Sequence, residues 1–277
     1  MLSALRYWSV LLILLALAPT LACAQSGAAP LPPGEAQARE RLNSSPRHGE
    51  WATVGDDAEK TKAWVVYPER SDKAPVVMVI HEIFGLTDWI RSVADQLAAD
   101  GFIAIAPDLL TGKGPDGGGT ESVDRDGAVA LIRKLEPAEV FRRLNAVAHY
   151  GMNLPAARPE FATIGFCWGG AMSFAYAAEQ PKLGAAVVYY GTSPSGEALA
   201  RVQAPVLGLY GGDDARVNAT VAPADETMKK LGKSYQHETY EGAGHGFLRA
   251  QDQREGANLR AAQQAWKQTI EFLKKEL

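Results

Sequence analysis

The stretch Ile164-Gly165-Phe166-Cys167-Trp168-Gly169-Gly170 decides the fold. Its Gly-x-Cys-x-Gly core has the form of a nucleophile elbow, a sharp turn that presents a reactive side chain between a strand and a helix. The apolar run Phe161 to Ile164 before it favours the strand, and the small-residue stretch Gly169 to Ala178 after it favours the helix. Glycines beside the nucleophile let the chain bend without Cβ clashes. We therefore predict that the thiol of Cys167 stands in a cleft at the top of a sheet.

Strand-like and helix-like segments alternate along most of the chain. Apolar or branched runs predict strands at 62–67, 76–80, 102–106, 161–164, 185–190, 205–210 and 235–240. Capping residues, glycine stops and apolar periodicity predict helices at 35–43, 87–100, 124–135, 138–152, 222–231 and 257–277. A glycine-rich loop is expected at 111–120. The alternation predicts a mostly parallel sheet with helices on both faces and an active site at the carboxyl ends of its strands.

Two further glycine-rich turns follow expected strands. Gly211-Gly212-Asp213-Asp214 follows the strand at 205–210, and Gly242-Ala243-Gly244-His245-Gly246 follows the strand at 235–240. The order thiol, carboxylate, imidazole is that of α/β-hydrolases, so we predict the α/β-hydrolase fold. In a triad of this kind His245 takes the thiol proton or pairs with the thiolate, and Asp214 fixes the imidazole tautomer. The helix N-terminus at the elbow is expected to favour the thiolate of Cys167.

An acyl intermediate needs hydrogen-bond donors for its oxyanion. We expect one from the backbone N–H of Trp168, directly after the nucleophile, and the other from Ile83, in the loop after the strand at 76–80. That loop begins His81-Glu82, as a zinc-protease helix does, but the second metal-binding histidine of such a motif would stand at Gly85. The sequence therefore predicts neither a metal site nor a cofactor.

These motifs together resemble the dienelactone hydrolase (carboxymethylenebutenolidase) family of cysteine-dependent α/β-hydrolases. The resemblance runs from about Trp64 to the C-terminus. It rests on His81-Glu82-Ile83-Phe84-Gly85, Ala106-Pro107-Asp108-Leu109, Gly165-Phe166-Cys167-Trp168-Gly169-Gly170, Gly211-Gly212-Asp213-Asp214 and Gly244-His245-Gly246-Phe247-Leu248-Arg249. Any one of them alone is weak, whereas the set is specific.

The resemblance implies roles for several residues. Glu82 corresponds to a family glutamate that contacts the resting thiol and helps to generate the thiolate when substrate arrives. Arg249 corresponds to an arginine that binds the substrate carboxylate. Of the two adjacent aspartates, Asp214 corresponds to the triad acid, which leaves Asp213 to cap the turn. Gly112, with Lys113 beside it, stands where the family has a second arginine, so the resemblance does not carry over dienelactone as the substrate.

The function these features indicate is hydrolysis of small esters or lactones through a cysteine acyl-enzyme. Two alternatives stay open from the sequence. The same fold can carry a ligand-binding or thiol-sensing protein that does not hydrolyse anything. A peptidase on this fold is the other alternative.

The N-terminus has the pattern of a secretory leader. Arg6 supplies a positive region, Val10 to Ala18 is an apolar core, and Ala22-Cys23-Ala24 is a cleavage site. We expect cleavage after Ala24, an exported and periplasmic protein, and no stable membrane insertion afterwards. Lipid anchoring through Cys23 is the alternative, although Thr20 replaces the leucine usual in such signals.

The mature chain would divide into a linker with a short helix at 25–60 and one catalytic domain at 61–277. It would hold Cys167 as its sole cysteine, so it could form no internal disulfide. The net charge of −4, with no block of lysine or arginine, argues against a nucleic-acid partner. The expected partner, from the triad motifs and the family resemblance, is a small-molecule ester or lactone.

Overall fold

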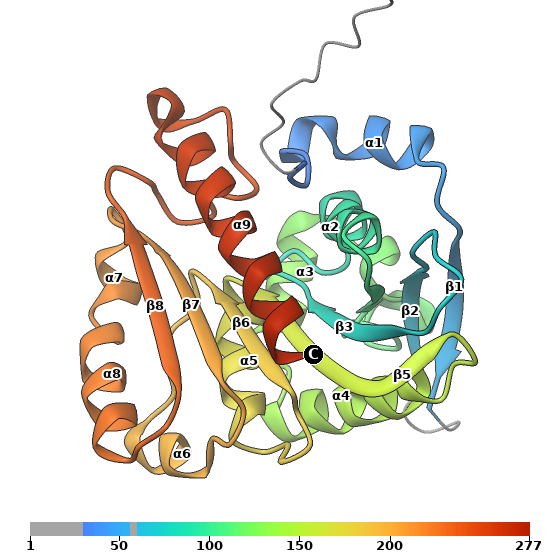
Figure 1. Ribbon diagram of the computed structural model, residues 1–277. Coiled ribbons are helices and arrows are strands. Elements are labelled where there is room, and N and C mark those ends of the chain that lie inside the picture. The colour runs from blue at the N-terminus through green and yellow to red at the C-terminus, as the bar shows by residue number, and fades with distance from the viewer. Residues whose placement is uncertain (1–29, 56–59) are drawn as a thin grey trace, which may run out of the picture.

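One mostly parallel sheet organises the chain (Figure 1). The computed structural model describes residues 30–55 and 60–277, so the expected leader and Cys23 lie outside the described residues. Within this part the sheet has eight strands in the order β1-β2-β4-β3-β5-β6-β7-β8. Strands β1 and β2 run antiparallel at one edge, and the other six are parallel. The strands are β1 (Gly49–Val54), β2 (Thr61–Val66), β3 (Ala74–Ile80), β4 (Ile103–Pro107), β5 (Ala157–Phe166), β6 (Ala185–Tyr189), β7 (Val206–Gly211) and β8 (Tyr235–Tyr240).

Helices cover both faces of this sheet. In Figure 1, α9 crosses the front of the sheet beside α2, and α4 and α5 lie behind it. The helices are α1 (Ala38–Ser44), α2 (Asp88–Ala99), α3 (Arg125–Ile132), α4 (Pro137–Met152), α5 (Trp168–Ala177), α6 (Gly196–Arg201), α7 (Ala215–Asn218), α8 (Val221–Lys230) and α9 (Ala257–Glu276). Short 3₁₀ turns occur at Glu35–Gln37, Pro115–Gly117, Thr120–Ser122 and Arg254–Gly256. The α/β-hydrolase fold expected from the sequence is confirmed.

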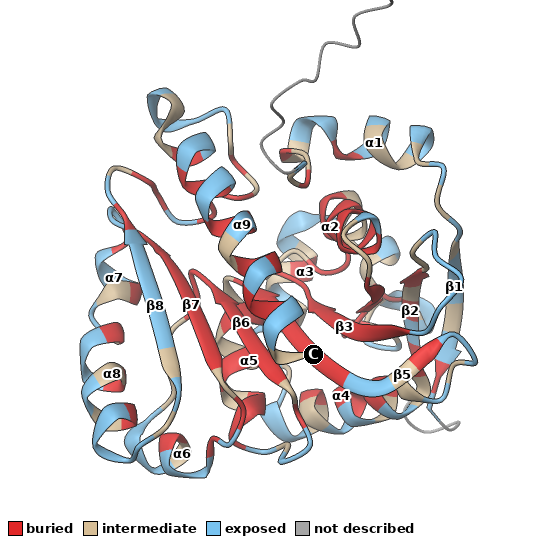
Figure 2. Ribbon diagram, in the orientation of Figure 1, coloured by how far each residue is buried: buried red, intermediate tan, exposed pale blue. Residues whose placement is uncertain are grey.

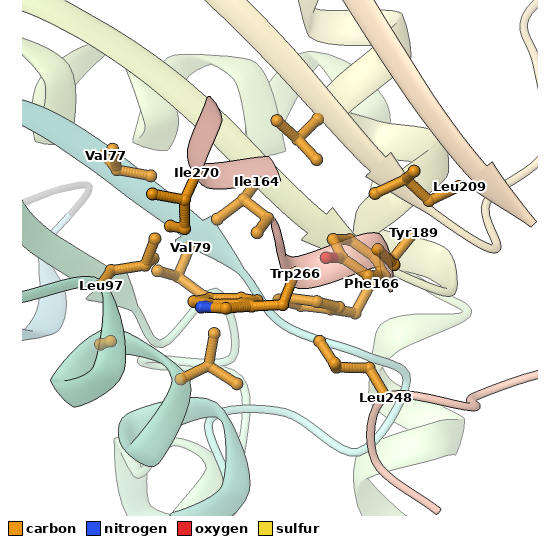
Figure 3. Close-up of a cluster of buried hydrophobic side chains, with 14 of the residues drawn as sticks. Val77, Val79, Leu97, Ile164, Phe166, Tyr189, Leu209, Leu248, Trp266 and Ile270 are labelled. Carbon is orange, nitrogen blue, oxygen red and sulfur yellow. The ribbon is translucent and has the colours of Figure 1, made fainter. Parts of the chain in front are cut away.

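The sheet separates two apolar layers because neighbouring residues of a strand point to opposite faces. In β3, Val77 and Val79 join the layer beneath α2 and α9, whereas Met78 and Ile80 join the layer beneath α4 and α5. All of β3 is buried, as a central parallel strand should be (Figure 2). Trp266 of α9 lies among Val79, Leu97, Ile164 and Phe166 in the first layer (Figure 3). This double layer holds the strand ends, and with them the candidate site, in a fixed frame.

The edges of the sheet depart most from expectation. The segment expected as linker and short helix contributes β1, which pairs with β2 from Gly49↔Val66 to Val54↔Thr61. Its alternation is weak because only Val54 is buried and Trp51 remains 54% exposed.

The short helices α6 and α7 were not expected either, because each has only one or two turns and lacks apolar periodicity. No helix in the described part of the chain combines the length and apolar composition needed to cross a bilayer.

Candidate active site

The nucleophile elbow forms between β5 and α5. Cys167 adopts φ 55° and ψ −114°, a strained conformation for a residue with a side chain, and its N–H donates to Tyr189 O at 3.0 Å. Two glycines allow the turn, as expected. A Cβ on Gly165 would lie 1.9 Å from Gly169 O, and a Cβ on Gly169 would lie 2.3 Å from Ile80 O. The backbones of β3, β5 and α5 therefore meet around Cys167 at distances that only glycine permits.

A thiol, an imidazole and a carboxylate line up at the carboxyl ends of three strands. His245, in the turn after β8, places Nε2 at 3.0 Å from Cys167 Sγ. Its Nδ1 lies 2.5 Å from Oδ2 of Asp214, which follows β7. Because the ionised carboxylate accepts, Nδ1 carries the proton and Nε2 faces the sulfur as an acceptor. The Tyr190 ring packs edge-on against the imidazole, with 5.2 Å between the ring centroids.

The two adjacent aspartates have separate tasks. Asp214 is buried, orients His245, and with Oδ1 accepts from Val217 N at 3.5 Å as the N-cap of α7. Asp213 points to the surface and pairs with Arg254 Nη1 at 2.5 Å. The expectation that Asp213 caps the turn is therefore wrong. Asp214 does both, because its two oxygens face the helix N-terminus and the imidazole.

The Cys167 thiol is protonated at rest. Burial is the largest cause that raises the pKa of Cys167 to about 11, and the negative charge of Glu82 raises it further. The Trp168 N–H and the exposed Arg216 act in the opposite direction, though less strongly. The helix N-terminus thus stabilises the thiolate as expected, but desolvation outweighs it.

Two backbone amides are available for an oxyanion. Trp168 N is the first amide of α5, and Ile83 N lies in the loop after β3. Among the described residues, neither amide donates to a backbone carbonyl, and the Trp168 N–H faces the Cys167 thiol. His81 shapes that loop, since its Nδ1 contacts Glu82 O at 2.8 Å and its Nε2 accepts from Leu109 N at 3.2 Å. Burial lowers the pKa of His81, so it is a neutral structural residue.

Four charged side chains near the thiol form a series of ion pairs. Glu82 is 4% exposed, and its Oε2 lies 2.9 Å from Arg249 Nε without the alignment of a hydrogen bond. Burial raises the pKa of Glu82 to about 7, although Arg249 partly offsets this. Arg249 also pairs with Glu35 at 2.5 Å, and Glu35 pairs with Arg125 at 3.1 Å. Nothing in residues 30–55 and 60–277 gathers three or more His, Cys, Asp or Glu side chains in a way that could hold a metal ion.

Comparisons with known proteins identify the family of the chain. The sequence profile of the dienelactone hydrolase family matches residues 61–277. The chain belongs to this family. A Salmonella typhimurium protein named "putative carboxymethylenebutenolidase" is 32% identical over 231 residues, which cover 79% of this chain and 83% of that protein.

Solved structures give the same result for the fold. A Klebsiella pneumoniae structure described as a "putative dienelactone hydrolase" matches with a TM-score of 0.71 and 29% identity, covering 81% of this chain and 97% of that one. The acylaminoacyl peptidase of Pyrococcus horikoshii matches with a TM-score of 0.65 at 16% identity, covering 87% of this chain and 44% of that one, and shares the fold alone.

This dienelactone hydrolase family member differs from the expected site in the position of Glu82. The resemblance implies contact between Glu82 and the resting thiol, but no hydrogen bond joins them among the described residues, and Glu82 faces Arg249 instead. Its effect on Cys167 is electrostatic. Arg249 does lie at the site, while Lys113, beside Gly112, pairs with Glu139 at 2.6 Å. Lys113 borders a separate cavity of about 980 Å³ that none of the triad residues lines.

The fold brings to the site several residues that no sequence motif predicted. Tyr190, Arg216, Arg125 and Glu35 all act on the catalytic groups or on Arg249. The Tyr190 hydroxyl is buried and has no hydrogen-bond partner in the described part of the chain. Of these four residues, only Arg216 stands close in sequence to a motif, because it follows Asp214 by two residues. The others come from segments with no motif of their own.

The raised pKa of Cys167 predicts how its alkylation depends on pH. A group whose pKa is raised stays protonated below that pKa, so reaction with iodoacetamide should be slow at pH 7 and accelerate about tenfold per pH unit towards pH 11. Glu82→Gln removes the charge that raises this pKa and should move the profile to lower pH. Mass spectrometry of the peptide containing Cys167 measures the rate.

The matched control for this measurement is Glu238→Gln, which removes a carboxylate from an exposed position of β8. It should leave the profile where it is. A wild-type midpoint below about 8.5, the ordinary pKa of a free thiol, would contradict the burial argument.

Proposed function

We propose that the chain hydrolyses small carboxylic esters or lactones through a Cys167-His245-Asp214 triad and a cysteine acyl-enzyme. The observation that carries the proposal is the line of sulfur, imidazole and carboxylate, 3.0 Å and 2.5 Å apart, at a nucleophile elbow. Membership of the dienelactone hydrolase family and the relative named for carboxymethylenebutenolidase activity support this class of substrate.

The first half-reaction forms the thioester. Cys167 Sγ attacks the carbonyl carbon while its proton passes to His245 Nε2, and Asp214 stabilises the imidazolium that results. The Trp168 and Ile83 amides donate to the oxyanion as the tetrahedral intermediate forms. On its collapse, the bond from carbon to the alcohol oxygen breaks, and His245 returns the proton to that oxygen.

The second half-reaction uses the same groups with water. His245 Nε2 accepts a proton from a water molecule, whose oxygen attacks the thioester carbonyl. The carbon–sulfur bond then breaks, Cys167 regains its proton, and the carboxylic acid product leaves. When the substrate is a lactone, its alcohol and acid are parts of one molecule, so a ring-opened hydroxy acid is released.

The protonated thiol argues against the thiol-sensing alternative. Oxidation of cysteine follows its thiolate character, and a pKa of about 11 leaves little thiolate at pH 7. A thiol that ionises only when it transfers its proton to a neighbouring base suits acyl transfer. The resting state of Cys167 therefore favours the hydrolase.

Removal of the nucleophile tests the proposal directly. With p-nitrophenyl acetate, the wild-type chain should release p-nitrophenolate in a burst followed by turnover, as an acyl-enzyme does. Cys167→Ala should abolish the burst and lower kcat by about 10³-fold or more. Intact mass spectrometry should show an added acetyl group on the wild type only. Equal rates for the two proteins would contradict the proposal.

The adjacent aspartates provide an internal comparison. Asp214→Asn removes the negative charge that stabilises the imidazolium, so we expect kcat to fall by about 10²-fold to 10⁴-fold. Asp213→Asn changes the same charge one residue away, at a surface ion pair with Arg254, and should change kcat less than about threefold. A larger loss in Asp213→Asn than in Asp214→Asn would reverse the assignment.

We also propose that the protein is exported and begins at Gln25 after cleavage of its leader. The leader pattern of residues 1–24 supports this proposal. Expression of the full chain in a Gram-negative host should yield a periplasmic protein whose N-terminal peptide starts at Gln25. A periplasmic protein that retains Met1, or one that carries a lipid on Cys23, would contradict cleavage after Ala24.

A further inference from the structure

The carboxylate of Glu35 forms ion pairs with two arginines, Arg249 and Arg125, beside the catalytic groups. Glu35 begins the 3₁₀ turn Glu35–Gln37, which lies before the residues matched by the family profile. Its Oε2 is 2.5 Å from Arg249 Nη1, and its Oε1 is 3.1 Å from Arg125 Nη1. The Phe84 ring lies under both guanidinium groups, at 3.6 Å from Arg125 and 5.4 Å from Arg249. Two cations thus share one carboxylate on an aromatic floor.

Arg249 interacts electrostatically with Cys167 through the carboxylate of Glu82. Arg249 stands four residues after His245 in the same turn, and its Nε faces Glu82 Oε2 at 2.9 Å. The charge of Glu82 in turn raises the pKa of Cys167. The phenol of Tyr190, whose ring packs on His245, also feels the charges of Glu82, Arg249 and Cys167. A charge added or removed at Arg249 therefore acts on molecules that approach the thiol.

We propose that Glu35 determines the charge selectivity of the site, because it neutralises Arg249 and Arg125 and so disfavours substrates that carry a carboxylate. The proposal rests on the ester and lactone hydrolysis proposed above. Glu82 has a pKa of about 7, so it is ionised in part of the molecules at neutral pH. When both carboxylates are ionised, they face two guanidiniums, and the net charge of the four groups is zero. In either state of Glu82, removal of the Glu35 charge makes the net charge of the group more positive by one, which attracts an anion.

Backbone contacts hold Glu35 in place independently of its carboxylate. Glu35 N donates to Arg249 O at 2.9 Å. Trp89 Nε1 donates to Pro33 O at 3.1 Å, and Gln251 Nε2 donates to Pro32 O at 2.9 Å. Glutamine has the same size as glutamate and can still donate or accept hydrogen bonds. Glu35→Gln therefore removes the charge while these three bonds keep the segment against the site.

The test compares two esters that differ only in charge. The acetyl ester of 4-hydroxybenzoate carries a carboxylate, and the acetyl ester of 4-hydroxybenzamide is its neutral counterpart. In Glu35→Gln the ratio of kcat/KM for the anionic ester to that for the neutral ester should rise at least about fivefold over wild type. The rise should come from a lower KM for the anion and should shrink as sodium chloride is added.

The matched control is Glu40→Gln, which removes a carboxylate from an exposed position of α1 five residues away. Its ratio should equal that of the wild type. A thermal melt confirms that both variants are folded. An unchanged or lower ratio in folded Glu35→Gln, or an equal rise in Glu40→Gln, would overturn the proposal.

A second readout does not depend on hydrolysis. Iodoacetate and iodoacetamide both alkylate Cys167 when the sulfur displaces iodide, and only iodoacetate carries a charge. Their rate ratio should rise about fivefold or more in Glu35→Gln and stay constant in Glu40→Gln. If no variant turns over either ester, hydrolysis is wrong, and this ratio still decides the role of Glu35. An unchanged alkylation ratio in Glu35→Gln would overturn it.

Discussion

The close approach of three backbones around Cys167 is the constraint on which the site depends. Gly165 and Gly169 leave no room for a Cβ, and this lets α5 start directly at the end of β5 while Cys167 stays at positive φ. The strain of that conformation is offset by the packing on both sides of the sheet. Because β7 and β8 run parallel to β5 in the same sheet, the turns that follow them place Asp214 and His245 at the carboxyl ends of the strands, where the thiol also lies. The triad is therefore a consequence of sheet topology together with one glycine-lined turn.

Burial gives the nucleophile its character. Burial raises the pKa of Cys167 to about 11, so the thiol is mostly neutral at pH 7. In the mechanism we propose, it ionises only when His245 accepts its proton. In that proposed mechanism, the cost of forming the thiolate falls in the step in which the sulfur attacks, and the proposed oxyanion donors Trp168 N and Ile83 N stabilise the same step. Glu82 increases this cost through its charge while its own pKa is about 7. Protonation of Glu82 near neutral pH therefore couples the ionisation of the thiol to the charges around Arg249.

The sequence predicted the parts of this site that are encoded locally. Each triad member sits on a glycine-rich turn directly after a strand, so its position follows from the strand pattern and the parallel topology. Strand β1 was not predicted, because an exposed edge strand shows little apolar alternation. The division of tasks between Asp213 and Asp214 depends on which carboxylate faces His245, and adjacent residues in a turn do not reveal that. The pKa of Cys167 is a sum over burial and several charges, of which only the helix N-terminus was visible in the sequence.

The contacts of Glu35 with Arg249 and Arg125 could not be predicted from the sequence, because they join residues that are far apart in the chain. Glu35 is 214 residues from Arg249 and 90 from Arg125, and no strand or helix register links them. Its position depends on Pro32 and Pro33, whose rings fix φ and whose carbonyls accept from Gln251 and Trp89. A segment with few accessible conformations loses less entropy when it docks, so a short N-terminal stretch can hold one carboxylate at the catalytic edge without a large interface. Charge selectivity in such a fold can therefore change through a terminal segment while the sheet, the elbow and the triad stay the same.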